Sequence, residues 1–152
     1  HTLDQWQAGK LTGLPQDESL STRAPKLSRA DGTVDFDQDA FKVMRRIHGL
    51  TPWPGVRVNW HPGGDQGDPA QRQELILRRV AEEPDMSCFY NPRGRPRPGL
   101  VLPEGRVAVR DGQIRLVEVQ SPGGRVMYFA DFVRGHRFQP GDWLGPVHHA
   151  AS

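Results

Sequence analysis

The stretch RVAVRDGQIRLVEV, residues 106–119, places two short apolar runs on either side of an Asp-Gly pair. Apolar residues recur at alternate positions in both runs, which is the pattern of β-strands that bury one face. Asp-Gly is a favoured pair in the tight turn of a β-hairpin. We therefore predict strands over Arg106–Arg110 and Ile114–Val119, joined by a turn at Asp111-Gly112.

Similar runs lie on both sides of this hairpin. Further strands are expected at 34–36, 56–60, 74–80 and 99–102, short helices at 38–48 and 127–134, loops at 61–70 and 85–98, and a turn at 139–142. Many short strands with Gly- and Pro-rich turns and two short helices indicate a mainly β fold, either a small β-barrel or an open β-roll. A parallel α/β sheet is excluded, because it needs longer helices between its strands.

The expected helix at 38–48 has one apolar face and one basic face. Asp37 is placed to cap its N-terminus, and Gly49 follows its last residue. Phe41, Met44 and His48 share the apolar face, with Ile47 beside them. The basic stripe consists of Lys42, Arg45 and Arg46. These cations suit a partner-binding surface, but cations near a helix C-terminus also complement the helix dipole, and the sequence leaves both interpretations open.

A turn with an aromatic centre follows this helix. Trp53 stands between Pro52 and Pro54 and is followed by Gly55. Because prolines restrict the backbone on both sides, we expect a rigid turn. We expect the Trp53 side chain to be buried against the barrel or the helix.

The first 31 residues differ in composition from the rest of the chain. Thr2–Leu11 has the spacing of a short helix, and 12–29 has the Gly, Pro, Ser and Asp content of a linker. We expect a compact domain at 32–145 and a tail at 146–152. Because the sequence does not begin with Met, we also expect it to be a piece of a longer chain.

Composition indicates a soluble protein with unevenly placed charge. Hydrophobic residues make up 36% of the chain, and no apolar run approaches the ~20 residues that span a bilayer. The only cysteine, Cys88, excludes an intrachain disulfide and favours a cytoplasmic location. Net charge is only +2, but residues 72–110 hold eight arginines against five acids. That segment is suited to attracting a polyanion, although solvated arginines need no partner.

Motifs that would carry chemistry are missing from the sequence. It contains no phosphate-binding glycine loop, no dinucleotide fingerprint and no Gly-x-Ser-x-Gly nucleophile turn. Its six histidines and one cysteine do not have zinc-finger spacing. We therefore expect no catalytic residue, no metal site and no cofactor site in this chain.

Three motifs in order resemble the C-terminal domain of folate-dependent formyltransferases of the methionyl-tRNA type. They are APKLSRADG at 24–32 followed by Val34-Asp35-Phe36, LTPWPG at 50–55, and the 123–142 segment with Met127, Asp131-Phe132, RGHR at 134–137 and QPGD at 139–142. Order and spacing agree over roughly residues 15–145. The sequence departs from the family pattern at Phe36, where Trp is usual, at Tyr128, where Ser is usual, and in a longer connection at 84–97.

This resemblance implies an OB-like β-barrel that follows a Rossmann-type catalytic domain. The catalytic Asn-His-Asp set and the pocket for 10-formyltetrahydrofolate would lie in that domain, of which residues 1–11 would be the last helix. In members that act on tRNA, the linker and the C-terminal domain form a positive surface, and Lys26 stands at the matching basic position of the linker.

Two functions follow as hypotheses from the resemblance. In the first, the domain orients initiator methionyl-tRNA for formyl transfer, through phosphate contacts that are mostly independent of base sequence. In the second, it is a structural or dimerisation module of a small-molecule formyltransferase without a nucleic-acid role. The oligomeric state stays open. Grouping of the basic residues with the linker favours the first hypothesis, and scattering favours the second. The candidates for tRNA binding are Lys26, Arg29, Lys42, Arg45, Arg46, Arg57, Arg78, Arg79, Arg93, Arg95 and Arg97. Strand alternation predicts that Arg78 and Arg79 face opposite sides.

Overall fold

The computed structural model describes residues 1–83 and 94–147. Most of the expected loop 85–98, including Arg93, lies outside the described residues, as does most of the expected tail 146–152.

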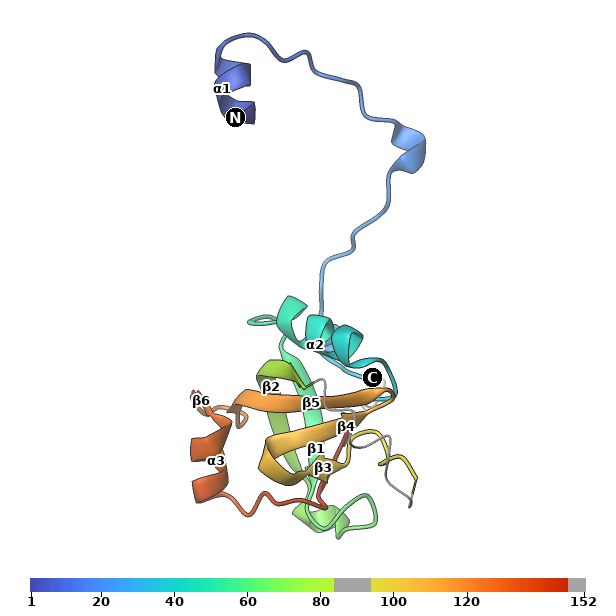
Figure 1. Ribbon diagram of the computed structural model, residues 1–152, viewed down its shortest axis with the longest axis vertical. Helices are drawn as coiled ribbons and strands as arrows, with labels where there is room; N and C mark the ends of the chain where they lie inside the picture. The colour runs from blue at the N-terminus through green and yellow to red at the C-terminus, as the bar shows by residue number, and fades with distance from the viewer. Residues whose placement is uncertain (84–93, 148–152) are drawn as a thin grey trace.

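Seven antiparallel strands form one sheet that curls into a nearly closed barrel (Figure 1). The strands are β1 (Val56–His61), β2 (Gln73–Glu83), β3 (Val101–Leu102), β4 (Arg106–Val109), β5 (Gly112–Gln120), β6 (Val126–Tyr128) and β7 (Trp143–Pro146). Their spatial order is β3-β4-β5-β2-β1-β7, and β6 pairs with β5. A hydrogen bond from Leu144 N to Gly99 O, 2.8 Å long, joins β7 to the segment before β3. The predicted fold class, a mainly β, OB-like small barrel, is confirmed.

β4 and β5 form the predicted hairpin, but the turn lies one residue earlier than expected. Val109 pairs with Gly112, so the turn consists of Arg110 and Asp111, and Gly112 begins β5. The Asp111 carboxylate accepts a hydrogen bond of 2.9 Å from Ala40 N, the first residue of helix α2 (Ala40–Gly49). The hairpin turn therefore also holds a helix in place.

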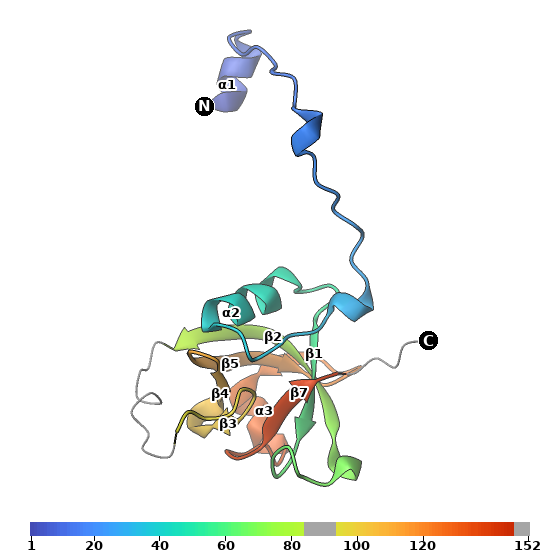
Figure 2. The same cartoon turned by 90° about the vertical axis from the view of Figure 1, so that its right-hand side faces the viewer.

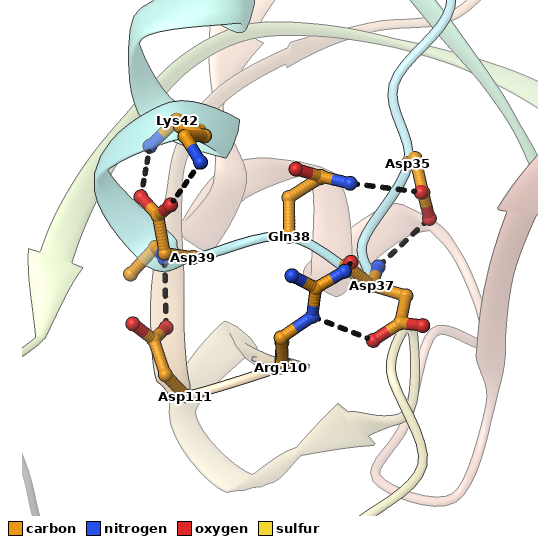
Figure 3. A network of polar contacts seen from close by, with 8 residues as sticks. Asp35, Asp37, Gln38, Asp39, Lys42, Arg110 and Asp111 are labelled. Carbon is orange, nitrogen blue, oxygen red and sulfur yellow. Dashed lines mark hydrogen bonds and ion pairs between the residues drawn. The ribbon is translucent and has the colours of Figure 1, made fainter.

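Helix α2 begins two residues later than predicted, because Asp39 rather than Asp37 caps it. Asp39 accepts a hydrogen bond of 2.8 Å from Lys42 N, which satisfies one of the free N–H groups at the helix start. Asp37 turns instead to the hairpin and pairs with Arg110 at 3.2 Å (Figure 3). Helix α3 (Phe129–Gly135) also begins later than predicted, because Val126–Tyr128 pairs with β5 as β6.

The buried face of α2 agrees with the predicted one only in part. Ile47 is fully buried and Met44 packs on the core as expected, and Val43 is fully buried as well, whereas Phe41 is 44% exposed and His48 is also exposed. The Phe41 ring instead lies under the Arg45 guanidinium, whose Cζ atom is 3.9 Å from the ring centre. The helix therefore packs on the barrel through Val43, Met44 and Ile47 and leaves its phenylalanine at the surface.

Residues 34–36 do not form the expected strand. Val34 and Phe36 are buried, as the alternation predicted, but their backbone joins no ladder of the sheet. Phe36 O accepts a hydrogen bond from Arg110 N, which ties this extended segment to the hairpin turn. The segment therefore contributes side chains to the core without extending the sheet.

A cluster of four aromatic side chains fills the core between α3 and the sheet. Phe132 contacts Trp60 edge-to-face, with ring centres 6.0 Å apart, and Phe138 lies 5.1 Å from both Trp60 and Phe129. The edge-to-face arrangements are those that aromatic pairs prefer. Because Trp60 belongs to β1, the cluster anchors α3 to the sheet.

Asp142 joins three separate segments at the end of the barrel. Its carboxylate is fully buried and accepts hydrogen bonds from Trp60 Nε1 at 2.8 Å, Gly63 N at 2.9 Å and Gln139 N at 2.9 Å. The predicted turn at 139–142 is confirmed, with its centre at Pro140 and Gly141. Strand β7, which follows directly, was not predicted.

His61, the last residue of β1, is a buried histidine packed on Trp143, with ring centres 4.9 Å apart. Burial, with a smaller contribution from the positive charge of Arg72, lowers the pKa of His61 below 6.5. The folded state then binds fewer protons than the unfolded state when the pH falls below that value, so protonation favours unfolding.

We expect the unfolding free energy to decrease as the pH falls from about 7 to 5, and a His61→Phe variant to lack part of this decrease. Urea denaturation of both proteins at several pH values measures it. His1→Gln, which removes an exposed imidazole, serves as the control and should keep the full pH dependence. Parallel curves for the parent and the His61→Phe variant would contradict this expectation.

The N-terminal part of the chain extends away from the barrel (Figures 1 and 2). It consists of helix α1 (Thr2–Gln7) and a linker that is exposed throughout residues 8–28. A short helix was predicted over Thr2–Leu11, and helix α1 ends earlier, at Gln7. In the part of the chain that the structure describes, no helix is both long and apolar enough to cross a membrane.

Candidate nucleic-acid interface

The linker meets the barrel at Gly32, where two backbone segments are in close contact. Gly32 O accepts a hydrogen bond of 2.8 Å from Arg57 N, the second residue of β1. A Cβ atom at position 32 would lie 2.3 Å from Gly55 O, closer than side-chain carbons approach a carbonyl oxygen. Glycine at position 32 therefore allows the linker to cross directly over the turn at 52–55.

Helix α2 holds the arriving linker through Arg46. Its guanidinium donates hydrogen bonds from Nε to Thr33 O at 2.6 Å and from Nη2 to Asp31 O at 2.9 Å. Both acceptors are neutral carbonyl groups, so Arg46 fixes the linker without losing its charge to a carboxylate in a hydrogen-bonded pair. Asp31 is nevertheless close, and the charge of Arg46 contributes, after the two hydrogen bonds from Ser28, to a lowered pKa of its carboxyl group.

Trp53 lies beside this entry point, and the prediction that it is buried is wrong. Its side chain is 54% exposed, whereas Pro54 and Gly55, which follow it, are buried. The bonds Thr51–Pro52 and Trp53–Pro54 are both cis.

Two further arginines border the Trp53 turn. Arg29 Cζ lies 6.0 Å from the centre of the Trp53 ring, at the outer limit of a cation–π contact. Arg78 Nη1 donates a hydrogen bond of 2.7 Å to Pro52 O, and its Nε donates one of 2.8 Å to the side-chain oxygen of Gln120. We call Arg29, Arg46, Trp53 and Arg78 the linker-entry surface.

The regular alternation that predicted opposite sides for Arg78 and Arg79 is interrupted at these two residues. The pairing of β2 with β5 is irregular between Leu77 and Val80, so an extra residue interrupts the alternation. Leu77 and Val80 remain buried, while Arg78 is half-buried and Arg79 exposed. At this irregularity, the backbone N–H of Val80 donates a hydrogen bond of 3.2 Å to His48 Nε2. Both arginines therefore lie at the surface.

Three of the candidate cations pair with carboxylates of the chain itself. Lys42 Nζ lies 3.1 Å from Asp39, and close ion pairs join Arg57 to Glu74 and Arg97 to Asp65. The charge available to a polyanion is reduced at each of these positions. Arg97 also lies apart from the linker-entry surface, with its Cζ 5.2 Å from the Trp143 ring.

Four candidate arginines have neutral partners instead. Arg29 and Arg45 lie over aromatic rings, Arg46 donates to backbone carbonyls, and Arg78 donates to a carbonyl and an amide oxygen. Lys26 and Arg95 are exposed, as is Arg79. The structure therefore brings Arg29, Arg46 and Arg78 together at the linker, with Arg45 next in sequence to Arg46, and leaves the remaining candidates outside this group.

The opposite end of α2 is acidic. Asp35, Asp37, Asp39 and Asp111 surround the helix start, with Lys42 and Arg110 among them (Figure 3). The pKa of Asp39 is lowered, first by the hydrogen bond from Lys42 N, so this carboxylate is ionised at neutral pH. The start of the helix therefore carries a net negative charge, whereas Arg45 and Arg46 give its C-terminal half a positive one.

A cleft of about 340 Å³ lies between residues 34–37 and β7, and the Trp143 indole that lines it already donates to Pro98 O at 2.9 Å. Within 1–83 and 94–147, no three side chains of His, Cys, Asp or Glu are grouped so as to hold a metal ion.

A barrel preceded by a linker, with the Pro-Trp-Pro-Gly turn at their junction, is the architecture expected from the three sequence motifs. Residues 26–137 match the family described as formyl transferase, C-terminal domain, and the chain belongs to that family.

This chain is similar to part of several longer bacterial proteins. The methionyl-tRNA formyltransferase of Geobacter sulfurreducens is 33% identical over 148 residues, which cover 95% of this chain and 41% of the relative. The methionyl-tRNA formyltransferase of Chlamydia abortus is 36% identical over 137 residues, which cover 89% of this chain and 40% of the relative. The methionyl-tRNA formyltransferase of Roseiflexus castenholzii is 33% identical over 147 residues, which cover 95% of this chain and 42% of the relative. The chain thus spans about two-fifths of the length of these relatives.

Proposed function

We propose that this chain is the part of a formyltransferase that holds and orients a charged initiator tRNA. The observation that carries the proposal is the grouping of Arg29, Arg46 and Arg78 where the linker joins the barrel. Phosphate groups are recognised by positive charge regardless of base sequence, and these arginines keep neutral partners. Similarity to relatives named methionyl-tRNA formyltransferase supports the choice of acceptor.

We propose that the formyl transfer itself takes place on a catalytic domain that precedes the linker, with 10-formyltetrahydrofolate as the donor. The family membership supports this division of labour. The exposed apolar side chains of α1, Leu3 and Trp6, are consistent with a helix that packs on such a domain. The lone cysteine supports a cytoplasmic location.

The alternative is a structural or dimerisation module of a small-molecule formyltransferase. The scattered, carboxylate-paired positions of Lys42, Arg57 and Arg97 are what that alternative predicts. A structural or dimerisation module does not require the linker-entry arginines to be grouped. Binding of tRNA to the isolated chain separates the two.

We expect the isolated chain to bind tRNA weakly, with micromolar or poorer affinity, and with an affinity that falls as salt is added. With about 3 to 5 phosphate contacts, log affinity against log salt should have a slope of about −2 to −5. Replacing Arg29 and Arg45 together by Gln should lower the magnitude of the slope by about one to two. Each phosphate contact that is lost removes about one counterion from the number released on binding. Filter binding or anisotropy at several salt concentrations measures the slope.

Arg137→Gln is the matched control. Arg137 is exposed near Trp60 and Pro62, at the end of β1 opposite to the one where the linker arrives. It should leave the slope nearly unchanged, and all variants should keep the parent's thermal midpoint. Equal losses for the Arg137→Gln and the Arg29/Arg45 variants would indicate diffuse attraction, and undetectable binding at low salt would favour the alternative function.

A further inference from the structure

Trp53 is exposed but held in a fixed position. Pro52 O accepts the hydrogen bond from Arg78, and Gly55 N donates one of 2.8 Å to Leu50 O, so both ends of the turn are fastened to the barrel and to α2. Thr51 adds hydrogen bonds from its hydroxyl to Ile47 O at 2.8 Å and Arg78 O at 3.2 Å. The indole is therefore presented to solvent by a rigid support. An aromatic ring held in this way offers a flat face on which an unpaired base can stack.

The surroundings of the indole are cationic rather than apolar. Arg29 lies at 6.0 Å from its ring, Arg78 holds the preceding carbonyl, and Arg46 holds the linker carbonyl at Asp31, two residues after Arg29. A protein surface that covered Trp53 would have to desolvate these guanidinium groups, which is costly without paired carboxylates. A nucleotide brings both an aromatic base and an anionic phosphate.

We propose that Trp53 is a stacking platform for an unpaired base of the bound RNA, with the neighbouring phosphates held by the linker-entry arginines. The proposal rests on the proposed function and adds a contact that double-stranded RNA cannot make. Bases stack on exposed aromatic side chains irrespective of sequence, since every base has a π-face, and arginines beside the ring hold the backbone. The RNA region that this surface selects is thus a single-stranded end, loop or bulge.

The test compares three labelled oligoribonucleotides of equal length with the complete 152-residue chain at low salt. One is single-stranded, one is single-stranded with abasic positions at its centre, and one is fully paired. Phosphates are present in all three, but only the first offers stackable bases at its centre. Trp53→Leu should weaken binding of the first about 5- to 150-fold and leave the other two unchanged, and Trp53→Phe should retain most of the affinity.

Trp6→Leu is the matched control, because Trp6 is a similarly exposed tryptophan on α1, at the far end of the linker (Figure 1). It should leave all three affinities unchanged. Quenching of tryptophan fluorescence by the single strand should persist in Trp6→Leu and be lost in Trp53→Leu. The thermal midpoints of both variants should match the parent.

The outcomes separate this proposal from the proposed function. If the chain binds all three oligonucleotides equally and Trp53→Leu changes nothing, stacking is overturned while phosphate binding stands, and Trp53 then fits a contact with a protein surface. Equal weakening of base-containing and abasic strands also overturns it. If no oligonucleotide binds at low salt, both proposals are overturned.

Discussion

Asp142→Ala should lower the free energy of unfolding by about 3 to 5 kcal/mol, one of the two largest losses that we expect in this chain. The carboxylate has no exposed surface, and it accepts hydrogen bonds from the indole of Trp60 and from the backbone of Gly63 and Gln139. Alanine leaves three inward-facing N–H groups without an acceptor, and each costs roughly 1–3 kcal/mol. Relief of the buried charge offsets part of this sum. Urea denaturation, analysed for midpoint and slope, measures the loss.

Asp68→Ala provides the control for this prediction. Asp68 is also an aspartate that accepts a backbone hydrogen bond, from Ala70 N at 2.9 Å, but it is exposed in the loop between β1 and β2. Water replaces its oxygen, so the expected loss is about 1 kcal/mol or less. Asp142→Asn should fall between the two, because the amide retains one acceptor oxygen. Similar losses for Asp68→Ala and Asp142→Ala would show that the three hydrogen bonds do not hold the barrel end together.

Phe132→Ala is expected to cost about 3 to 5 kcal/mol, the usual range for a buried phenylalanine. The ring is 1% exposed, contacts Trp60 and Phe138 edge-to-face, and stacks on His136 with ring centres 3.9 Å apart. Its removal leaves a cavity between α3 and β1, since neither element is free to close it. Chemical denaturation gives the loss.

Val133→Ala, one residue later in α3, is the comparison for Phe132→Ala. Val133 is partly exposed, and replacing it by alanine removes little buried surface while raising helix propensity. The change in unfolding free energy should stay below about 1 kcal/mol. A loss for Phe132→Ala no larger than this would mean that α3 is not anchored through the aromatic cluster.

Much of the fold could be predicted from the sequence, because its signals are local. Val56, Val58 and Trp60 alternate with polar residues, and their side chains are buried in β1. Strand β7 was missed because Trp143–Pro146 contains a glycine and a proline, and it is a strand only through its pairing with β1, over 80 residues earlier in sequence. The boundary of α2 was misplaced because two aspartates, Asp37 and Asp39, were both suitable caps.

The candidate site was less predictable, because its charges are decided by contacts between distant segments. Sequence identifies Arg57, Arg78 and Arg97 as cations but does not indicate that Glu74 and Asp65 pair with two of them. The β-bulge beside Arg79 has no signature in a run of apolar and basic residues. The two prolines around Trp53 indicate a rigid turn, but rigidity is compatible with a buried or an exposed indole.

The barrel is entered and left at one corner. Where the linker arrives, Gly32 is hydrogen-bonded to Arg57 of β1. At the end of β7, Pro146 pairs with Val58, the next residue of β1. Two chain ends placed in this way are about 10 Å apart or less, given the spacing of neighbouring strands. The module therefore has the geometry of an insertable unit: a short glycine loop joining 32 to 146 would close it, and new termini at the exposed Gly123 turn would open it as a circular permutant.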